Sequence, residues 1–516
     1  MSARGSATTA TSAPMPEWSA WPPGRMPPAA LVAVILVMFG IVWLAMLSYT
    51  TLTPPTDNIE QLTWIGSLEA GYYKHPPLPT WLFWLPATLF GATARTSYVV
   101  GAVCTLGTIA LLWRLLSDLR GSGYALLALL AVLCIAYYNG RLYYYNHNVV
   151  LMWFVTASAT LCWKAHSTRR LRWWVGLGVA LGLGALAKYQ IAVTVVCVLA
   201  FWLHQRGWRD PVARLGLLLA ALISLLLFVP HLQWLRDHDF GPIHYALDSS
   251  LGVHRAPSVR WGDSFHWLAD QVLNRAAPAW MLLGWAIYAQ RDGPKPTPQE
   301  TQVPDTSHDK SSRALLLIWG IVPLLFMPLV GLFAGADLQL QWGTPFLLFA
   351  VPAAMEISSR WVAWSRRGLK PALKAFVVIQ SMLLLVSYLT SLRGPLALQD
   401  RHWRTFDGAA LAAAIAPRAR EALGGRICVV SGPGALAGAM ALELPEHPSV
   451  LIDGRYDRSP WVDKRVVKTC GAVELSDGAA PLGSEPVGSE FPRLSWRIRP
   501  PSPTSDASTS AMNPAP

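Results

Sequence analysis

Residues 29–48 read AALVAVILVMFGIVWLAMLS, an uninterrupted run without a charged side chain. An α-helix needs about 20 mainly apolar residues to cross the hydrocarbon core of a bilayer, so this stretch predicts a transmembrane helix. A second apolar run occupies residues 215–229. The polar start of the chain lacks a small-residue cleavage site after a short apolar core, so we expect the first run to be retained as a span.

The composition of the whole chain also indicates a multi-spanning membrane protein. Of the 516 residues, 53% are hydrophobic and only 14% are charged, whereas soluble proteins carry about a quarter charged residues. The net charge of +12 could suggest a nucleic-acid partner. However, Lys and Arg cluster in short loops between apolar runs, which is typical of loops retained on one side of a membrane. We therefore expect a bilayer and no nucleic acid as partner.

Charge in the loops decides how many apolar stretches cross. The eleven candidate spans are residues 29–49, 97–115, 122–138, 148–163, 173–187, 190–203, 215–234, 277–290, 314–333, 339–356 and 375–392. A further stretch, Leu78–Phe90, is short and is interrupted by Pro79 and Pro86. If the amino terminus is cytoplasmic and Leu78–Phe90 does not cross, the basic loops all face the cytoplasm, as the positive-inside rule requires. We predict an all-α polytopic protein with about 11 transmembrane helices and a juxtamembrane helix at Leu78–Phe90.

The chain divides into four predicted regions. Residues 1–28 are expected to be a disordered cytoplasmic segment, and residues 29–392 the transmembrane domain. Residues 393–485 have a soluble composition, with short strands near 427–431 and 449–453 around a helix, which predicts a small extracytoplasmic α/β domain. The Pro- and Ser-rich residues 486–516 are expected to be a disordered tail. Residues 291–312 are interpreted as a flexible cytoplasmic linker.

The outer-face loops carry the residues that can perform chemistry. Successive spans cross the membrane in opposite directions, so the outer face carries loops 50–96, 139–147 and 235–276 and the turn at Lys188. These segments can surround one cavity. The first loop contains Asp57-Asn58-Ile59-Glu60. On a helical turn, Asp57 and Glu60 would share one face, and a carboxylate can act as a general base. The alternative is an ordinary solvated acid.

Three cationic or titratable side chains accompany the acids. Lys74 and His75 stand before Pro76 and Pro77, which restrict the backbone there. Lys188 separates two apolar stretches with almost no loop, and an ion so close to hydrocarbon is functional by default. The alternative for these side chains is snorkelling to the membrane interface.

These motifs, Asp57-x-x-Glu60 followed by Lys74-His75-Pro76-Pro77-Leu78, resemble the bacterial members of the dolichyl-phosphate-mannose protein mannosyltransferase superfamily. That group includes the lipid A aminoarabinose transferases and glycosyltransferase family 39 proteins, all of the GT-C fold. The resemblance covers roughly residues 30–360 and is sharpest over 57–78 and 140–190.

The resemblance implies an activity and a set of site residues. A monosaccharide would be transferred from a polyprenyl (undecaprenyl) phosphate to an acceptor hydroxyl on a lipid, glycan or protein, outside a bacterial inner membrane, with inversion. Asp57 and Glu60 would be catalytic, and Lys74, His75 and Lys188 would bind the donor phosphate. The implied substrate-binding residues are Tyr73, Asn146, Asn148, His244 and Arg255.

The chain departs from many relatives at Tyr145-Asn146-His147-Asn148, where they carry an acidic residue. An amide cannot act as a base, so this loop would orient substrate or bind sugar hydroxyls, or merely cap a helix. A divalent metal ion is left open, since His75, Glu60 and His244 could supply ligands, although no spacing is diagnostic.

Other functional classes remain as alternatives. A lipid or solute transporter would place polar residues near the bilayer midplane, whereas here they cluster at one interface; a non-catalytic scaffold would tolerate Asp57→Asn. The sequence does not specify the sugar or the acceptor. In the predicted outer domain, Cys428 and Cys470 are a hypothetical disulfide pair, because oxidising conditions permit one there.

Overall fold

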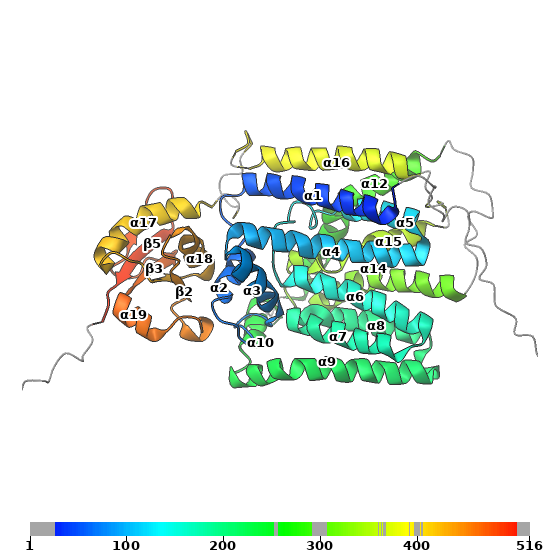
Figure 1. The fold of residues 1–516 in the computed structure, drawn as a ribbon, viewed down its shortest axis with the longest axis horizontal. Coiled ribbons are helices and arrows are strands. Elements are labelled where there is room, and N and C mark those ends of the chain that lie inside the picture. The colour runs from blue at the N-terminus through cyan, green and yellow to red at the C-terminus, as the bar shows by residue number, and fades with distance from the viewer. Residues whose placement is uncertain are drawn as a thin grey trace, which may run out of the picture.

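The computed structural model describes residues 26–251, 256–291, 307–359, 361–362, 364, 368–391, 393–396, 403 and 406–502. A bundle of long helices makes up most of the molecule, and a small α/β unit sits against one end of it (Figure 1). The prediction of a mainly helical polytopic fold with a small α/β part is confirmed.

Each bundle helix corresponds to one of the predicted spans, although two of the helices are markedly shorter. They are α1 (Pro28–Thr50), α4 (Ala94–Arg120), α5 (Ser122–Val132), α6 (His147–Thr168), α7 (Leu171–Ala187), α8 (Ala192–His204), α9 (Pro211–Asp237), α12 (Ala277–Tyr288), α14 (Ser307–Ala334), α15 (Ala350–Ser358) and α16 (Leu369–Leu389). The start of α14 overlaps the predicted linker 291–312, so that prediction is wrong for residues 307–312; residues 292–306 lie outside the described part. The predicted disordered segment 1–28 is described only from residue 26.

Six helices of the described chain are long and apolar enough to cross a bilayer, namely α1, α4, α6, α9, α14 and α16. Their outer faces expose large apolar side chains, such as Leu218 (69% exposed) and Leu225 (65%) on α9. An apolar surface of this extent is expected against lipid rather than water. Eleven spans remains a prediction.

Two predicted spans are shorter or broken because they lie inside the bundle. The helix α5 has only 11 residues, and its residues from Tyr124 to Val132 are all buried. The stretch 339–356 forms the short 3₁₀ turns Leu340–Gly343 and Leu347–Phe349 before α15. Irregular backbone is tolerated at membrane depth where protein surrounds it.

Short helices cover the end of the bundle that meets the α/β unit (Figure 1). They include α2 (Thr56–Trp64), α3 (Leu78–Phe90) and α10 (Gly241–Ala246). The bounds of α3 are those predicted for the juxtamembrane helix. Its outward side exposes Trp81, Trp84 and Phe90, and tryptophan is enriched at membrane interfaces.

The α/β unit is a five-stranded sheet of order β2-β1-β3-β5-β4. Its strands are β1 (Val429–Gly432), β2 (Ser449–Ile452), β3 (Ala472–Asp477), β4 (Glu485–Pro486) and β5 (Leu494–Arg499). β1 pairs in parallel with β2 and β3, and β5 is antiparallel to β3 and β4. The helices are α17 (Gly408–Leu423), α18 (Gly434–Glu443) and α19 (Lys464–Cys470).

The prediction of a disordered tail from residue 486 is wrong at its start. β5 continues the sheet to Arg499, and Trp496 is buried in the core of the unit. The reason is visible in residues 494–499, where apolar and polar side chains alternate, as they do in a half-buried strand. Residues 503–516 of the predicted tail lie outside the described part.

The α/β unit is fixed directly to the start of the first predicted outer loop. The hydroxyl of Thr53 donates to Phe406 O (2.8 Å) and accepts from Gly408 N (2.9 Å). On α18, Gly438 allows close approach to α2, because a Cβ there would lie 2.3 Å from Cγ2 of Ile59. The unit therefore supports the helix that carries Asp57 and Glu60.

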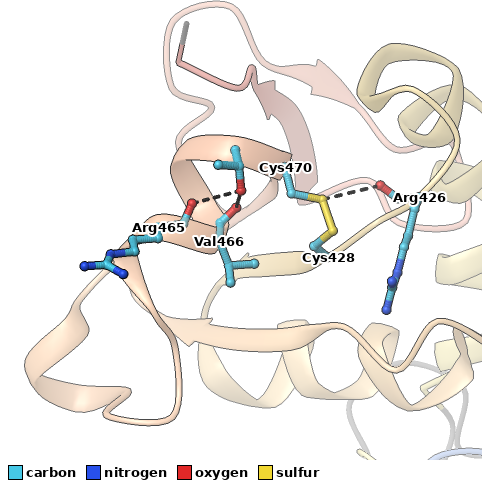
Figure 2. The surroundings of a disulfide bond; sticks show 6 residues. Arg426, Cys428, Arg465, Val466 and Cys470 are labelled. Atoms are coloured by element: carbon cyan, nitrogen blue, oxygen red, sulfur yellow. Dashed lines mark hydrogen bonds between the residues drawn. A yellow bond between two sulfur atoms is a disulfide. The ribbon is translucent and has the colours of Figure 1, made fainter. Parts of the chain in front are cut away.

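The hypothesised disulfide is present in the structure. Cys428, next to β1, is bonded to Cys470 at the end of α19 (Figure 2), with a Cα–Cα separation of 6.2 Å. The Sγ atom of Cys470 also lies 3.9 Å from Arg426 O. The bond ties the end of α19 to the residue before β1.

Candidate active site

The helix α2 is anchored through the residues between its two acids. Asn58 is fully buried and donates through Nδ2 to Ser97 Oγ and to Tyr143 O, both at 2.9 Å. Its Oδ1 accepts from Tyr145 N at 3.0 Å. Because these bonds fix the inner side of α2, the positions of Asp57 and Glu60 on it are fixed as well.

Asp57 is joined to the start of α6. Its Oδ2 accepts a 2.8 Å hydrogen bond from Nδ2 of Asn146. Asn146 is also the N-cap of α6, where its Oδ1 accepts from Val149 N at 3.0 Å. The same amide therefore caps the start of α6 and holds a carboxylate. The capping role left open by the sequence is present, and substrate binding by this loop stays a prediction.

Lys188 reaches the same helix start two residues further on. Its Nζ donates to Oδ1 of Asn148 at 2.6 Å, and it lies 5.7 Å from the ring centre of Trp342. Among the described residues it makes no ion pair with an acid. Burial, only partly offset by Asp57, lowers the pKa of Lys188 to about 8.

A tight turn presents the basic corner predicted at residues 72–75. Tyr72 N donates to His75 O (3.0 Å) and His75 N donates to Tyr72 O (3.2 Å), so Tyr73 and Lys74 form the tip. Lys74 Nζ lies 2.9 Å from Oε1 of Glu60. Sequence reasoning did not pair these two residues.

The environment of this ion pair changes the proton affinity of both groups. Burial raises the pKa of the Glu60 carboxyl, and Lys74 only partly offsets this effect. Burial by itself lowers the pKa of Lys74. The nearby Glu60, Tyr73 and Tyr245 outweigh burial, so the pKa of Lys74 is raised. Both pKa shifts favour the protonated forms of Glu60 and Lys74. Lys74 is therefore held as a cation beside the Glu60 carboxyl.

His75 packs against a second histidine. Its ring centre lies 4.1 Å from that of His147 and 6.4 Å from that of Trp64. Burial, together with His147 and Lys188, lowers the pKa of His75 well below its usual value. His75 is therefore neutral near pH 7 and offers a hydrogen bond rather than a charge. His147 is buried, and its Nε2 has no hydrogen-bond partner among the described residues.

A relay of contacts connects the Lys188 turn to the loop before Lys74. The hydroxyl of Tyr189 and Nε2 of His231 are 2.7 Å apart, and Nδ1 of His231 is 2.7 Å from Ala70 O. The next residue, Gly71, must lack a side chain, because a Cβ would lie 2.3 Å from the ring of Trp234. Helix α9, which carries His231 and Trp234, thus sets the distance between Lys188 and Lys74.

The remaining predicted substrate-binding residues have different positions. Tyr73 packs edge-on against Tyr245 of α10, with ring centres 6.1 Å apart, and Arg458 of the α/β unit lies 5.2 Å from its ring centre. His244 is exposed on α10, and its neighbour Tyr245 makes the contact instead. Arg255 lies outside the described residues. Tyr245, His147 and Arg458 were missed because their approach depends on the packing of distant loops.

No group of three or more His, Cys, Asp and Glu side chains in the described chain is arranged to hold a metal ion. The three ligands considered from the sequence do not gather. Glu60 pairs with Lys74, the ring of His75 packs at a tilt against that of His147, and His244 is exposed. The donor set is therefore one acid pair, amides and cations, arranged around the starts of α2 and α6.

Part of the chain is similar to known protein families. Residues 74–234 match the family described as dolichyl-phosphate-mannose-protein mannosyltransferase. The undecaprenyl phosphate-alpha-4-amino-4-deoxy-L-arabinose arabinosyl transferase of Erwinia tasmaniensis is 25% identical over 51% of this chain and 46% of its own length. The lipopolysaccharide core galacturonosyltransferase of Rhizobium johnstonii is 22% identical over 77% of both chains. The chain spans about half the length of the aminoarabinose transferases it matches.

The fold is also that of a solved transferase. The crystal structure of ArnT from Cupriavidus metallidurans in the apo state superposes with a TM-score of 0.59 over 91% of this chain and 98% of that chain, at 14% sequence identity. A second structure of that protein, bound to undecaprenyl phosphate, gives the same TM-score. The architecture is thus the GT-C fold of integral-membrane glycosyltransferases. Within that class, the sequence is similar to the aminoarabinose transferases named above, which belong to the group that residues 57–78 resemble.

Proposed function

We propose that this chain is a membrane glycosyltransferase that moves a monosaccharide from a polyprenyl phosphate to an acceptor hydroxyl on a lipid, glycan or protein at the outer face of a bacterial inner membrane. One observation carries the proposal. Asn146 and Asn148, two residues apart at the start of α6, bind an acid and a cation that come from distant loops. A transfer from a lipid phosphate needs both a base for the acceptor and positive charge for the leaving group.

In the proposed reaction, the acceptor oxygen attacks the anomeric carbon of the sugar. Asp57 takes the hydroxyl proton as the new C–O bond forms, and a positioned base of this kind contributes about 10²–10⁴-fold to the rate. The bond between the anomeric carbon and the phosphate oxygen breaks, and the electron pair leaves with the polyprenyl phosphate. A single displacement inverts the anomeric centre.

Lys188 is the proposed partner of the leaving phosphate. It is held by a neutral amide rather than by an acid, so its charge remains for an anion. Preorganised charge at the position where negative charge develops lowers the barrier strongly. Lys74 is ion-paired with Glu60 and is proposed to hold the Tyr72–His75 turn in addition to contributing positive potential. The unpaired Nε2 of buried His147 is proposed to bond a sugar hydroxyl or phosphate oxygen.

Relatives support the donor class. Curated relatives named for undecaprenyl phosphate-linked aminoarabinose transfer, and a structural relative crystallised with undecaprenyl phosphate, make the same lipid the proposed carrier here. The transporter alternative has no support among these relatives, and the polar side chains gather at one end of the bundle.

The proposal is tested by sugar transfer in membranes containing the Asp57→Asn variant. Transfer should fall by about 10²-fold or more, with the protein inserted in normal amounts. The matched control is Asp118→Asn. This variant removes the acid of an exposed ion pair with Arg114, at the end of α4 that lies away from the candidate active site. Undiminished transfer by Asp57→Asn would remove Asp57 from the mechanism.

A further inference from the structure

The α/β unit reaches the candidate active site through the connection that follows β2, residues 453–461. This connection meets the bundle part of the chain at two points. A Cβ on Gly66, just beyond α2, would lie 3.0 Å from Cβ of Trp461. The guanidinium of Arg458 lies 5.2 Å from the ring centre of Tyr73. The connection therefore contacts both the end of α2 and the tight turn that carries Tyr73.

Hydrogen bonds to β2 hold this connection in place. The hydroxyl of Ser459, which is fully buried, accepts from Ile452 N at 2.8 Å. Nε1 of Trp461 donates to Val450 O, also at 2.8 Å. Because the residues on both sides of position 460 are bonded to the sheet, the position of Arg458 is set by the α/β unit and not by the bundle.

Arg458 is oriented by an acid from the same connection. Its Nη1 lies 2.7 Å from Oδ2 of Asp453. Asp453 has a left-handed backbone, with φ 52°, which Asp and Asn adopt more readily than other residues with a side chain. Burial is the main cause of the raised pKa of Tyr73, and the charges of Glu60 and Asp453 add to it. Acids from both parts of the chain therefore act on Tyr73.

Tyr73 connects this contact to the ion pair of the candidate site. Nζ of Lys74 lies 5.3 Å from the Tyr73 ring centre and 2.9 Å from Oε1 of Glu60. The Tyr73 ring also packs edge-on against Trp64 of α2, with ring centres 6.0 Å apart. Since a cation is attracted to the face of an aromatic ring, a shift of the Tyr73 ring would move the ammonium group of Lys74.

We propose that Arg458 is a positioning residue for sugar transfer, which holds the Tyr73 ring and thereby the ammonium group of Lys74 at the donor site. The Asp453 carboxylate orients the guanidinium for this role. The α/β unit thus shapes the donor site directly, in addition to supporting α2. This inference rests on the proposed function, because Arg458 acts through Lys74.

Hydrogen exchange tests the positioning role without any sugar transfer. In the full-length Arg458→Gln protein in nanodiscs, the peptide of residues 70–78 should exchange about fivefold faster than in the wild type, the factor expected for a lost cation–π contact at a partly exposed site. Arg455→Gln is the matched control, since Arg455 forms an exposed pair with Asp457 on the same connection. It should leave this exchange unchanged. Wild-type exchange in Arg458→Gln, or equal acceleration in Arg455→Gln, would overturn the proposal.

Affinity for undecaprenyl phosphate, measured with the purified protein in nanodiscs, gives a second readout. Arg458→Gln should weaken binding about fivefold, whereas Arg458→Lys keeps a cation at the ring and should stay within about twofold of the wild type. In the Tyr73→Leu background, Arg458→Gln should have no further effect, because no ring remains for the cation to contact. A loss in Arg458→Lys equal to that in Arg458→Gln, or additive losses with Tyr73→Leu, would contradict a role through the ring.

The two measurements separate this inference from the proposed function. If the wild type neither binds undecaprenyl phosphate nor transfers sugar, the proposed function is contradicted, and the exchange comparison still decides whether Arg458 holds the turn. If the wild type binds and transfers normally while Arg458→Gln shows wild-type exchange and affinity, only the positioning role is overturned.

Discussion

Lys188 donates a 2.6 Å hydrogen bond to Asn148, and this bond places a half-buried cation near the carboxylate that Asn146 holds. Asn146, two residues earlier and the N-cap of α6, donates to Asp57 at 2.8 Å. A single helix start therefore sets the geometry between the proposed base and the proposed phosphate-binding side chain. The proposed chemistry depends on this relationship.

The two asparagines should affect different kinetic constants. Asn148→Ala leaves Lys188 without its acceptor and should raise KM for the lipid-linked donor about tenfold, since a hydrogen bond to a charged group contributes about 1.5–3 kcal/mol. Asn146→Ala should instead lower kcat, because Asp57 loses its orienting contact. Steady-state kinetics in nanodiscs distinguishes the two. Identical effects of both variants on KM and kcat would contradict separate roles.

Donor binding should weaken as pH rises through about 8. The pKa of Lys188 is lowered by burial from 10.5 to about 8, so the amine loses its charge above that pH. The folded state then binds fewer protons than the unfolded state between about 8 and 10.5, so this group makes folding stability rise with pH over that range. Loss of binding there cannot be ascribed to this group destabilising the fold.

The matched variant for this pH effect is Lys188→Arg, because a guanidinium stays charged over the range. Measured between pH 7 and 9, donor affinity of the arginine variant should be nearly flat, even if its absolute affinity is lower. The same downward slope in both proteins would assign the titration to another group.

The contact between α18 and α2 should be necessary for activity. Gly438→Ala places a Cβ 2.3 Å from Ile59 Cγ2, and overpacking of this kind costs about 1–3 kcal/mol. Because Ile59 lies between the two acids of α2, we expect at least a tenfold loss of transfer. Gly434→Ala is the control, since its Cβ would meet Ile452 at 3.5 Å. Equal activity of the two variants would show that α2 does not depend on this contact.

The disulfide should stabilise the α/β unit. Closing a loop across the sequence separation of 42 is worth about 4 kcal/mol in the chain-entropy model, so Cys428→Ala with Cys470→Ala should lower the Tm of the unit. Alkylation of the unfolded wild type without reductant should label only Cys104, Cys134, Cys162 and Cys197, which are free thiols. Labelling of Cys428 and Cys470 as well would exclude the bond.

The sequence predicted much of the helical fold because apolar length and loop charge determine it directly. Leu78–Phe90 has the predicted bounds, since Pro77 directly precedes it and Gly91, with a positive φ of 86°, ends it. The buried helix α5 and the broken stretch at residues 339–356 could not be anticipated, because hydropathy measures apolar length and not whether protein or lipid surrounds it. The strand Leu494–Arg499 was missed because the Pro- and Ser-rich residues around it dominated the composition, although its alternation was a usable signal.

The site was predictable as a set of loops but not as a set of contacts. The alternating direction of the spans predicted that Asp57, Lys74 and Lys188 lie on the same outer face of the membrane. The structure brings their loops together. The Lys74–Glu60 pair and the Asn146–Asp57 bond join residues by packing that no local pattern encodes. His244 and Tyr245 illustrate the limit, since a one-residue difference on α10 decides which side chain meets Tyr73.

The central proposal is sugar transfer from a polyprenyl phosphate with Asp57 as base, and lipid mass spectrometry of cells tests it most directly. Cells lacking the gene are complemented with the wild type or with Asp57→Asn at equal membrane abundance. The wild type should restore one class of glycoconjugate that carries an added monosaccharide. The Asp57→Asn cells should lack that class and accumulate a polyprenyl-phosphate monosaccharide. If both cells contain the same glycoconjugates and the same polyprenyl-phosphate pool, the proposed reaction is contradicted.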